Sequence, residues 1–519
     1  MRARDASIPK LRAVSLALGV TLVFASAACT VLLDRSATQC QTDDDCSKFG
    51  GHPFCQSGAC VVSGLGPTGC FYGSPEQPDD FLNQCSAAQC LAFDDCARLG
   101  MCGDASDADA ALVPPPPPTS TSSDGGVAAP DGGPSLPLCL DPDNGRAQVV
   151  FITGSSNFPP LLAKLSPLVL ATGYTPVYQV TSSCAGVKSA FSQATSDQTI
   201  VDPPPGPSAK YAAYFQQDGT SVPCTLGPSG AQVDIGESDV FSTTCDATDV
   251  AGSAVGEYLG PIQAMAIVVP GKSQETAISA DAARAVFGMG GAGATPWNDP
   301  SLYFIRNANT GTQQMIGHAI DVPASGFWGT DRGTAANVDA LLRVITDPTV
   351  AERAIGIISA DYYDADRANL KALAFKATEQ DCAYLPDSTA FKKDKQNVRD
   401  GHYPIWGPIH FFTAVSNGVP VSAGAQAFVS VVSVPNIPQS LLDAFIGSSL
   451  VPSCAMEVER SSELGALSTY AASFQCGCYF EASPSVNGAP PSECRQCTTA
   501  NDCTDPSRPA CNLGYCEVQ

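Results

Sequence analysis

The stretch "AQVVFITGSSNFPPLLAKLSPLVLATG", Ala147 to Gly173, decides the fold. Its first residues are mostly apolar and β-branched, which favours a strand, and after a small polar loop the apolar residues recur at helical spacing. "TPVYQVTSSCAGVKSAFSQA" (175–194) and "LYFIRNANTGTQQMIGHAI" (302–320) repeat that order. Repeated strand–loop–helix units predict an α/β domain with a mostly parallel sheet. In such sheets ligands bind beyond the carboxyl ends of the strands, where these loops lie.

All three loops carry hydroxyls or amides at the start of an expected helix. Such a start binds anions, because its unpaired N–H groups and its helix dipole both favour negative charge. The third loop adds a lone cation, Arg306, before Thr310, Gly311 and Thr312. One interpretation is an anion site. The alternative is that Thr310 only caps a helix and that Arg306 is solvated.

Composition narrows the class of protein. The chain has 519 residues, with 51 acidic and 27 basic side chains and a formal net charge of −24. This balance argues against nucleic acid as a partner, since phosphate backbones are bound by basic surfaces. It does not argue against a small anion, which a local pocket can bind. The 23 cysteines favour export to an oxidising compartment.

Residues 1–28 have the pattern of a secretory signal peptide, with basic residues followed by an apolar stretch that ends in small residues. "SAAC" (26–29) is similar to a bacterial lipobox, with Ser26 where leucine is usual, so we expect Cys29 to be lipidated and to anchor the chain to a membrane. The alternative is ordinary cleavage that leaves Cys29 for a disulfide. Setting Cys29 aside leaves 22 of the 23 cysteines, an even number that favours lipidation. No later apolar run predicts a transmembrane helix.

Short cysteine-rich segments flank the expected α/β domain. "CQTDDDCSKFGGHPFCQSGAC" (Cys40–Cys60) and "CTTANDCTDPSRPACNLGYC" (Cys497–Cys516) share nearly the same cysteine spacing. They contain too little apolar surface to fold unaided, which predicts disulfide-rich modules over 29–102 and 481–519. Zinc is the rival, but it requires paired C-x2-C or histidine spacing. Residues 103–145, with five consecutive prolines, predict a stiff solvated tether that leaves the first module independent of the domain.

No motif indicates catalysis. "GMGGAG" (288–293) matches a dinucleotide fingerprint, but it follows a helical pattern and leads into a turn, whereas the fingerprint needs a strand before it and a helix after it. His402 and His410 lie in an aromatic-rich stretch and are expected in the core or at the surface rather than as bases. We therefore predict no enzyme, no catalytic residues, no cofactor and no metal site.

The loops resemble those of the periplasmic phosphate-binding proteins of ABC transporters, over residues 146–480. "SSNFPPLL", "SSCAGVK", "VDIGESD" and "RNANTGT" are similar to that family's anion-binding segments. The resemblance implies a type II periplasmic-binding-protein fold with a hinge between two lobes, about 146–262 with 402–480 and about 263–401. It implies these ligand-binding residues: Asn157, Phe158, Ser183, Asp239, Arg306, Thr310, Gly311 and Thr312.

Three departures from the family pattern affect the expected site. Asn157 replaces a threonine, Cys184 replaces a serine, and Ala308 replaces the aspartate that pairs with the arginine. Tetrahedral oxyanions other than phosphate therefore become plausible ligands. Asp239 can only accept a hydrogen bond when ionised, so it would favour a protonated anion and repel sulfate. Its alternative role is a helix N-cap.

These observations predict an exported, lipid-anchored solute-binding protein that delivers phosphate or a similar oxyanion to an ABC transporter permease. The alternative is a cell-surface interaction or sensor protein that uses its cysteine-rich modules, with a binding domain of altered specificity.

Overall fold

The computed structural model describes the strands 54–56 and 59–61 and the ranges 70–71, 73–99, 136–206, 209–247, 254–292, 294–434, 437–491 and 493–518. The predicted signal peptide, Cys29 and most of the predicted tether lie outside these residues. The chain divides into two compact units, Met1–Tyr72 and Gly73–Gln519. In the first unit, β1 (Phe54–Gln56) and β2 (Ala59–Val61) pair as antiparallel strands.

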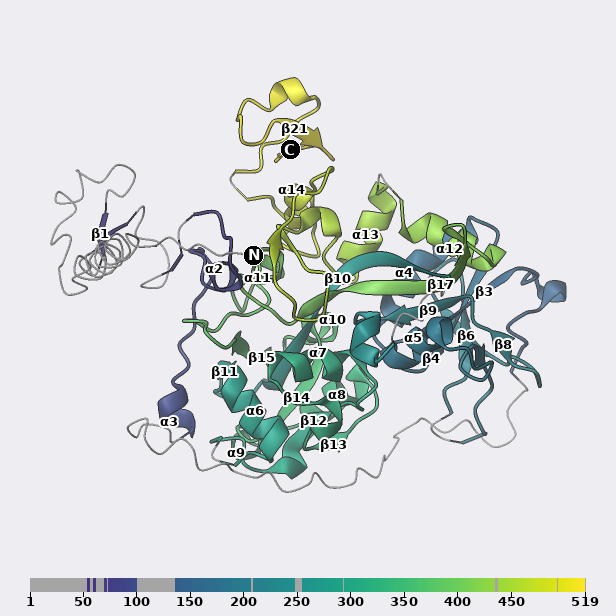
Figure 1. Ribbon diagram of the computed structural model, residues 1–519, viewed down its shortest axis with the longest axis horizontal. Helices are drawn as coiled ribbons and strands as arrows, with labels where there is room; N and C mark the ends of the chain where they lie inside the picture. The colour runs from purple at the N-terminus through teal and green to yellow at the C-terminus, as the bar shows by residue number, and fades with distance from the viewer. Residues whose placement is uncertain are drawn as a thin grey trace, which may run out of the picture. The chain divides into compact units, whose positions relative to one another are not determined.

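A mixed sheet is the centre of the second unit (Figure 1). One parallel group contains β3 (Val149–Gly154), β4 (Thr175–Val180) and β9 (Ile235–Ser238). The other contains β12 (Tyr303–Ile305), β13 (Thr330–Asp331) and β14 (Ile355–Ser359). The remaining strands on the main path are β6 (Ala212–Phe215), β7 (Ser221–Cys224), β10 (Val255–Pro270) and β17 (Trp406–Ser416). The order is β13-β12-β14-β10-β17-β9-β3-β4-β6-β7.

Two long antiparallel strands join the parallel groups. The first part of β10, Val255 to Ala264, pairs with β17, and its continuation from Met265 pairs with β14. β17 in turn pairs with β9. The molecule therefore has lobe 1 around β3, β4 and β9 and lobe 2 around β12 and β14, which confirms the predicted two-lobed α/β class. The sheet is mixed rather than mostly parallel, because the crossing strands are antiparallel to their neighbours.

Helices follow the strands as the sequence predicts. Lobe 1 contains α4 (Pro159–Leu170) and α5 (Ser183–Phe191), together with α12 (Ala423–Val432) and α13 (Gln439–Gly447). Lobe 2 contains α6 (Ala280–Met289), α7 (Gly311–Ala319), α8 (Ala335–Leu342) and α10 (Ala360–Ala365). α6 ends within the "GMGGAG" segment, with Gly290 at φ 65° as its C-cap, so the described part of this segment ends a helix rather than opening one.

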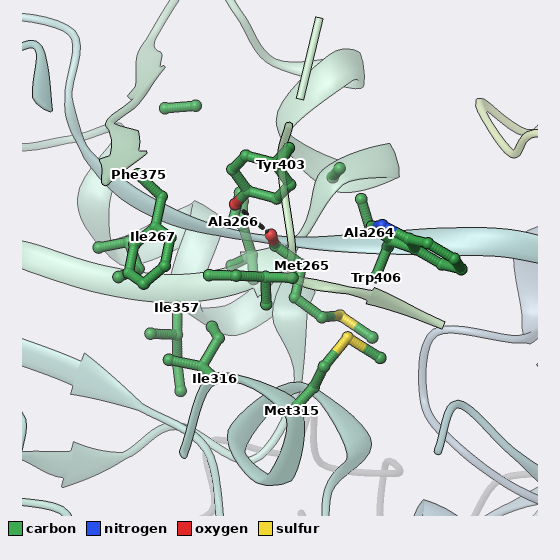
Figure 2. Close-up of a cluster of buried hydrophobic side chains, with 14 of the residues drawn as sticks. Ala264, Met265, Ala266, Ile267, Met315, Ile316, Ile357, Phe375, Tyr403 and Trp406 are labelled. Carbon is green, nitrogen blue, oxygen red and sulfur yellow. Dashed lines mark hydrogen bonds between the residues drawn. The ribbon is translucent and has the colours of Figure 1, made fainter. Parts of the chain in front are cut away.

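The hydrophobic core of lobe 2 includes residues of the antiparallel strands β10 and β17. Met265, Ile357 and Trp406 are buried together, and Tyr403 Oη donates a 2.6 Å hydrogen bond to the Met265 carbonyl (Figure 2). His402 and His410 are also buried, within hydrogen-bonding distance of Asp400 and Glu257 respectively.

Part of the first cysteine-rich segment belongs to the α/β unit, contrary to the predicted independence. α2 (Pro78–Leu82) buries Phe81, which is 2% exposed, in the main core. A disulfide joins Cys90 to Cys382 in lobe 2. The end of the predicted tether is also held to the domain, because Cys139 forms a disulfide with Cys224 at the end of β7. Independence was predicted from the low apolar content of these segments. Their few large side chains instead pack into a core that is made mostly of residues from the α/β domain.

The C-terminal segment forms the predicted disulfides. Within it, Cys497 pairs with Cys511 and Cys503 pairs with Cys516. Cys478 at the start of α14 (Gly477–Ala482) pairs with Cys494 and links this segment to the domain. The sulfurs of Cys497, Cys503 and Cys516 lie within 4.8 Å of one another. Disulfide bonding nevertheless removes the thiolates that a zinc ion would bind.

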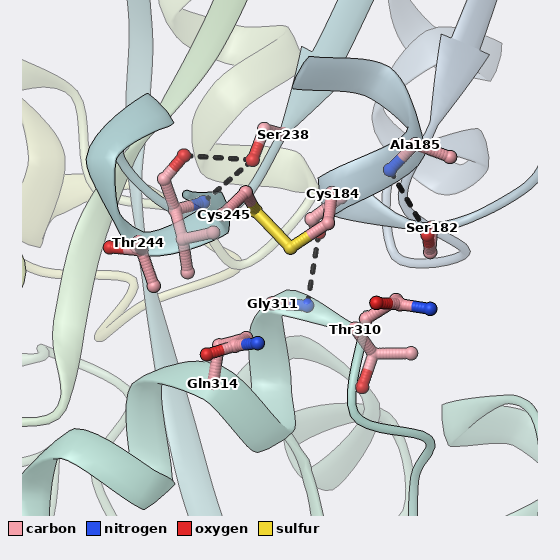
Figure 3. Close-up of a disulfide and its surroundings, with 12 residues drawn as sticks. Ser182, Cys184, Ala185, Ser238, Thr244, Cys245, Thr310, Gly311 and Gln314 are labelled. Carbon is pink, nitrogen blue, oxygen red and sulfur yellow. Dashed lines mark hydrogen bonds between the residues drawn. A yellow bond between two sulfur atoms is a disulfide. The ribbon is translucent and has the colours of Figure 1, made fainter. Parts of the chain in front are cut away.

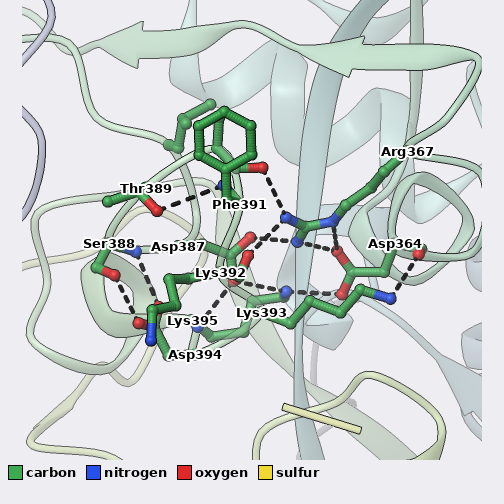
Figure 4. A network of polar contacts seen from close by, with 12 residues as sticks. Asp364, Arg367, Asp387, Ser388, Thr389, Phe391, Lys392, Lys393, Asp394 and Lys395 are labelled. Carbon is green, nitrogen blue, oxygen red and sulfur yellow. Dashed lines mark hydrogen bonds and ion pairs between the residues drawn. The ribbon is translucent and has the colours of Figure 1, made fainter. Parts of the chain in front are cut away.

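A buried ion network fixes the loop between residues 387 and 395 (Figure 4). Lys395 Nζ lies 2.7 Å from Asp364 Oδ2 and 2.9 Å from Asp387 Oδ1. Arg367 contacts the same two carboxylates and donates to the Lys392 carbonyl at 2.5 Å. Opposite charges balance, which allows these groups to be buried.

Across the described ranges, none of the helices is long and apolar enough to cross a membrane.

Candidate functional site

The predicted loops meet where lobe 1 faces lobe 2. Lobe 1 contributes the turn after β3, the first turn of α5, and Asp239, which directly follows β9. Lobe 2 contributes the segment from Arg306 to the start of α7. All of the predicted site residues are buried. Their ligand-binding roles stay predictions.

Asp239 is the centre of the lobe 1 half. Its Oδ2 accepts hydrogen bonds from Ser155 Oγ at 2.5 Å, Asn157 Nδ2 at 3.0 Å and Ser183 Oγ at 3.3 Å. Its Oδ1 has no hydrogen-bond partner within the described part of the chain. Burial raises the pKa of Asp239, while these donors and the charge of Arg306 oppose the rise. The alternative role as an N-cap is wrong, because the following 3-10 helix, Ser242–Cys245, is capped at Phe241.

Hydrogen bonds cross between the lobes at the start of α7. The Gly311 amide donates to Ser183 Oγ at 3.0 Å, and Asn157 Nδ2 donates to Thr312 Oγ1 at 3.2 Å. The Cys184 amide donates to the Asn309 carbonyl at 3.1 Å. Figure 3 shows this junction beside the Cys184–Cys245 disulfide. The lobes are therefore closed on each other at this point.

Gly311 of lobe 2 packs closely against Asp239 and Ser183 of lobe 1. A Cβ atom on Gly311 would lie 2.6 Å from Asp239 Cβ and 2.7 Å from Ser183 Oγ. A real Cβ atom cannot come this close without movement of its neighbours, so glycine is the residue that allows this contact. The glycine in the predicted Thr310-Gly311-Thr312 segment is thus explained by the packing of the two lobes.

Arg306 is 1% exposed, so the alternative of a solvated arginine is wrong. Its Nε donates to the Gly333 carbonyl at 3.1 Å, and its Nη2 donates to Ser156 Oγ at 2.8 Å. Its Nη1 has no hydrogen-bond partner among the described residues. Burial lowers the pKa of Arg306 to about 10, and the charge of Asp239 partly opposes this. Neutral oxygens of Gly333 and Ser156 thus accept from this arginine, where the resemblance had implied an aspartate partner.

Two predicted ligand-binding residues, Phe158 and Thr310, do not offer a polar side-chain atom to the centre of the site. The Phe158 ring packs in the lobe 1 core against Tyr178 and Phe411, with ring centroids 5.3 and 5.5 Å away. Thr310 is the N-cap residue of α7, but its Oγ1 donates back to the Asn307 carbonyl at 2.8 Å. Any contact of these residues with a ligand would have to come from other atoms.

Glu237 is a site residue that the sequence prediction missed. Its Oε2 accepts from the Ser155 amide at 2.7 Å and lies 2.9 Å from Tyr178 Oη. Burial raises the pKa of Glu237 well above its usual range, and the charge of Asp239 raises it further. A signal was present, because residues two apart on a strand face the same side and Glu237 precedes Asp239 by two.

A disulfide fixes the lobe 1 half of the site. Cys184 follows Ser183 in the first turn of α5, and its partner Cys245 ends the 3-10 helix that follows Asp239. The bond therefore ties the segment that carries Ser183 to the segment that carries Asp239. It also gives a role to the cysteine that replaces the expected serine.

Comparisons with known proteins give structural similarity only. No protein-family model and no curated protein matches the chain. A putative phosphate ABC transporter substrate-binding protein from Clostridium perfringens with bound phosphate is 13% identical, with a TM-score of 0.38 over 59% of this chain and 99% of that one. An ABC-type phosphate transport receptor from Vibrio cholerae is 14% identical, with a TM-score of 0.37 over 58% and 99%. The CcmR regulatory domain from Synechocystis, in complex with 2-PG, is 10% identical, with a TM-score of 0.27 over 55% and 94%. At these values the similarity carries no argument about ligand or partner.

Proposed function

We propose that this protein is an exported solute-binding protein that captures phosphate or a similar tetrahedral oxyanion between its lobes for an ABC permease. One observation carries the proposal. Arg306 Nη1 and Asp239 Oδ1, a donor and an acceptor, are both buried and both lack a hydrogen-bond partner among the described residues.

A ligand that pairs with both Arg306 Nη1 and Asp239 Oδ1 must accept one hydrogen bond and donate another. A buried polar group without a partner costs about 1–3 kcal/mol, and more when it is charged. An oxyanion accepts the charge-assisted hydrogen bond that Arg306 can donate. Asp239, when ionised, can only accept, so the same ligand has to bring a proton of its own. A protonated tetrahedral oxyanion satisfies both atoms, whereas sulfate satisfies only the arginine.

The contacts between the lobes support capture by closure. The bond from the Gly311 amide to Ser183 Oγ forms only when α7 of lobe 2 meets α5 of lobe 1. Buried donors that are already in place need little rearrangement on binding, which favours affinity. No reacting group is required, and the proposed role ends with release to the permease.

Export and anchoring form the cellular part of the proposal. Every cysteine whose side chain the structure describes is disulfide-bonded, which favours an oxidising compartment. The signal peptide and the lipidated Cys29 lie outside the described residues and stay predictions. With a lipid anchor the protein would remain at a membrane, close to a permease.

Calorimetry on the full chain tests this function. Phosphate, arsenate, sulfate and a small carboxylate are titrated into the wild type, Arg306→Ala and Arg343→Ala. Arg343 is the matched control, because it lies in the same lobe with a side chain 47% exposed. We expect phosphate or arsenate to bind the wild type and the control, and Arg306→Ala to lose about 2–5 kcal/mol of binding free energy. Binding of none of these anions would contradict the proposal and favour the interaction or sensor alternative.

A further inference from the structure

The Tyr178 hydroxyl makes two hydrogen-bond contacts with oxygen atoms but has only one proton. A tyrosine hydroxyl has one proton to donate. Tyr178 Oη lies 2.5 Å from the Ser155 carbonyl oxygen and 2.9 Å from Glu237 Oε2, both at hydrogen-bonding distance. The Ser155 carbonyl can only accept, so we assign the tyrosine proton to the shorter hydrogen bond, which Tyr178 donates to this carbonyl. The contact with Glu237 then needs a second proton, and the carboxyl group of Glu237 is the group that can carry it.

Within the described part of the chain, the surroundings of Glu237 supply no positive charge to hold it ionised. β4 contributes Tyr178, the turn after β3 contributes Ser155, and β17 places Phe411 opposite Glu237 in register. Helix α5 approaches through Gly186, where a Cβ atom would lie 1.9 Å from the Glu237 carbonyl oxygen. The remaining titratable neighbour is Asp239, whose negative charge opposes ionisation of Glu237.

We propose that Glu237 is a specificity-determining residue of the anion site, a protonated carboxyl that restricts the site to singly charged oxyanions that carry a proton. This inference rests on the proposed function. With Glu237 neutral, the charges of Arg306 and Asp239 cancel, and the bound anion adds one negative charge. An ionised Glu237 would add a second negative charge within the same buried site, where charges interact strongly.

The prediction is a steep dependence of affinity on pH. Above the second pKa of phosphate, the ligand must take up one proton to bind as the monoanion, which lowers affinity about tenfold per pH unit. Where Glu237 also ionises in the ligand-free protein, the wild type must take up a second proton and the loss becomes steeper. Glutamine has nearly the same size and is neutral at every pH, so Glu237→Gln should lose the part of the pH dependence that comes from ionisation of Glu237.

The experiment titrates inorganic phosphate into the full chain from mildly acidic to mildly alkaline pH, with Asp234→Asn as control. Asp234 directly precedes β9, and its Oδ2 accepts from the Phe151 amide at 2.8 Å, much as Glu237 accepts from the Ser155 amide. We expect Glu237→Gln to match the wild type at acidic pH and to bind at least about tenfold more tightly at alkaline pH. The control should follow the wild type throughout.

Infrared spectroscopy of the ligand-free protein gives an independent result. The protonated-carboxyl absorption band of the wild type at neutral pH should fall by the share of one carboxyl group in Glu237→Gln and stay unchanged in Asp234→Asn. Parallel pH profiles for the wild type and Glu237→Gln, or no change in that band, would overturn the inference. If the wild type binds no phosphate at any pH, the proposed function fails, and the band still reports whether Glu237 is protonated.

Discussion

The Gly311 amide of lobe 2 donates a hydrogen bond to Ser183 Oγ of lobe 1 at 3.0 Å, and the same hydroxyl lies 3.3 Å from Asp239 Oδ2. Ser183 therefore connects the start of α7 to Asp239, the carboxylate that we propose accepts a hydrogen bond from the ligand. Closure and recognition share an atom, so a change that keeps the lobes apart should also weaken binding.

Gly311→Ala should prevent full closure. The added Cβ would lie 2.6 Å from Asp239 Cβ and 2.7 Å from Ser183 Oγ, which is closer than atoms can approach without movement. We expect phosphate affinity to fall by at least about tenfold, roughly 1.4 kcal/mol, with little change in stability. Small-angle scattering with and without phosphate measures closure. Gly326→Ala is the control, since its Cβ would meet nothing nearer than 3.9 Å. Full compaction of the Gly311 variant would contradict this role.

Asp239→Asn should relax the choice of ligand rather than abolish binding. The amide can donate as well as accept, so it no longer requires a proton on the ligand. We expect sulfate to bind more tightly than to the wild type and phosphate to lose affinity modestly. Calorimetry with both anions measures the preference. Equal small losses for phosphate and sulfate would argue that Asp239 has only a structural role.

His402 should make stability depend on pH. Its Nδ1 lies 2.7 Å from Asp400 Oδ1 and its Nε2 lies 2.6 Å from the Gln84 carbonyl oxygen, so both ring nitrogens face acceptors. Burial opposes the charged ring, but Asp400 and the Gln84 carbonyl outweigh it and raise the pKa of His402. Because the folded-state pKa is raised, this stabilisation is complete below the unfolded pKa of about 6.5 and is lost as pH rises through the folded-state pKa.

Urea unfolding across that pH range measures the effect. His402→Gln should reduce the decrease in stability with rising pH, whereas the exposed His318→Gln should leave it unchanged. If both variants follow the wild type, the His402 contacts do not stabilise the attachment of Gln84.

Lys395→Met should destabilise the protein strongly. Lys395 is 2% exposed, and its removal leaves Asp364 and Asp387 with Arg367 as their remaining cation. Breaking a buried ion pair in this way costs about 3–5 kcal/mol. Lys392→Met, on the exposed part of the same loop, should change the free energy of unfolding by less than about 0.5 kcal/mol. Chemical denaturation of both variants distinguishes them, and similar small effects would show that the network contributes little.

Local sequence patterns predicted the strand–loop–helix units well, because each unit is specified by neighbouring residues. Ala147 to Gly173 became β3 and α4 with the polar loop between them. The antiparallel crossing of β10 and β17 was not predicted, because these strands are far apart in the sequence and pairing between them leaves no local pattern. The independence of the first cysteine-rich segment was wrongly predicted for a related reason, since its Phe81 packs into a core made mostly of later residues.

The candidate site was predicted as a set of loops, and the structure brings those loops together. The partners of Arg306 could not be predicted, because Ser156 and Gly333 lie on different lobes and reach the arginine only through the tertiary fold. Glu237 could have been found from the two-residue period of its strand. A buried carboxyl group is not expected beside an anion site, however, because two negative charges repel each other. The contacts of Glu237 with Tyr178 and Ser155, which the sequence does not show, are what account for its place there.

The disulfide between Cys90 and Cys382 spans 292 residues of chain, which constrains how the protein matures. If the chain crosses the membrane from its N-terminus, Cys90 arrives long before its partner, while Cys139, Cys184 and Cys224 arrive in between. Oxidation in order of arrival would join the wrong cysteines. The native pairing therefore requires Cys90 to stay reduced, or to be released from a mixed pair by thiol–disulfide exchange, until lobe 2 has been exported. Maturation of this protein should accordingly depend on a disulfide isomerase in the compartment that receives it.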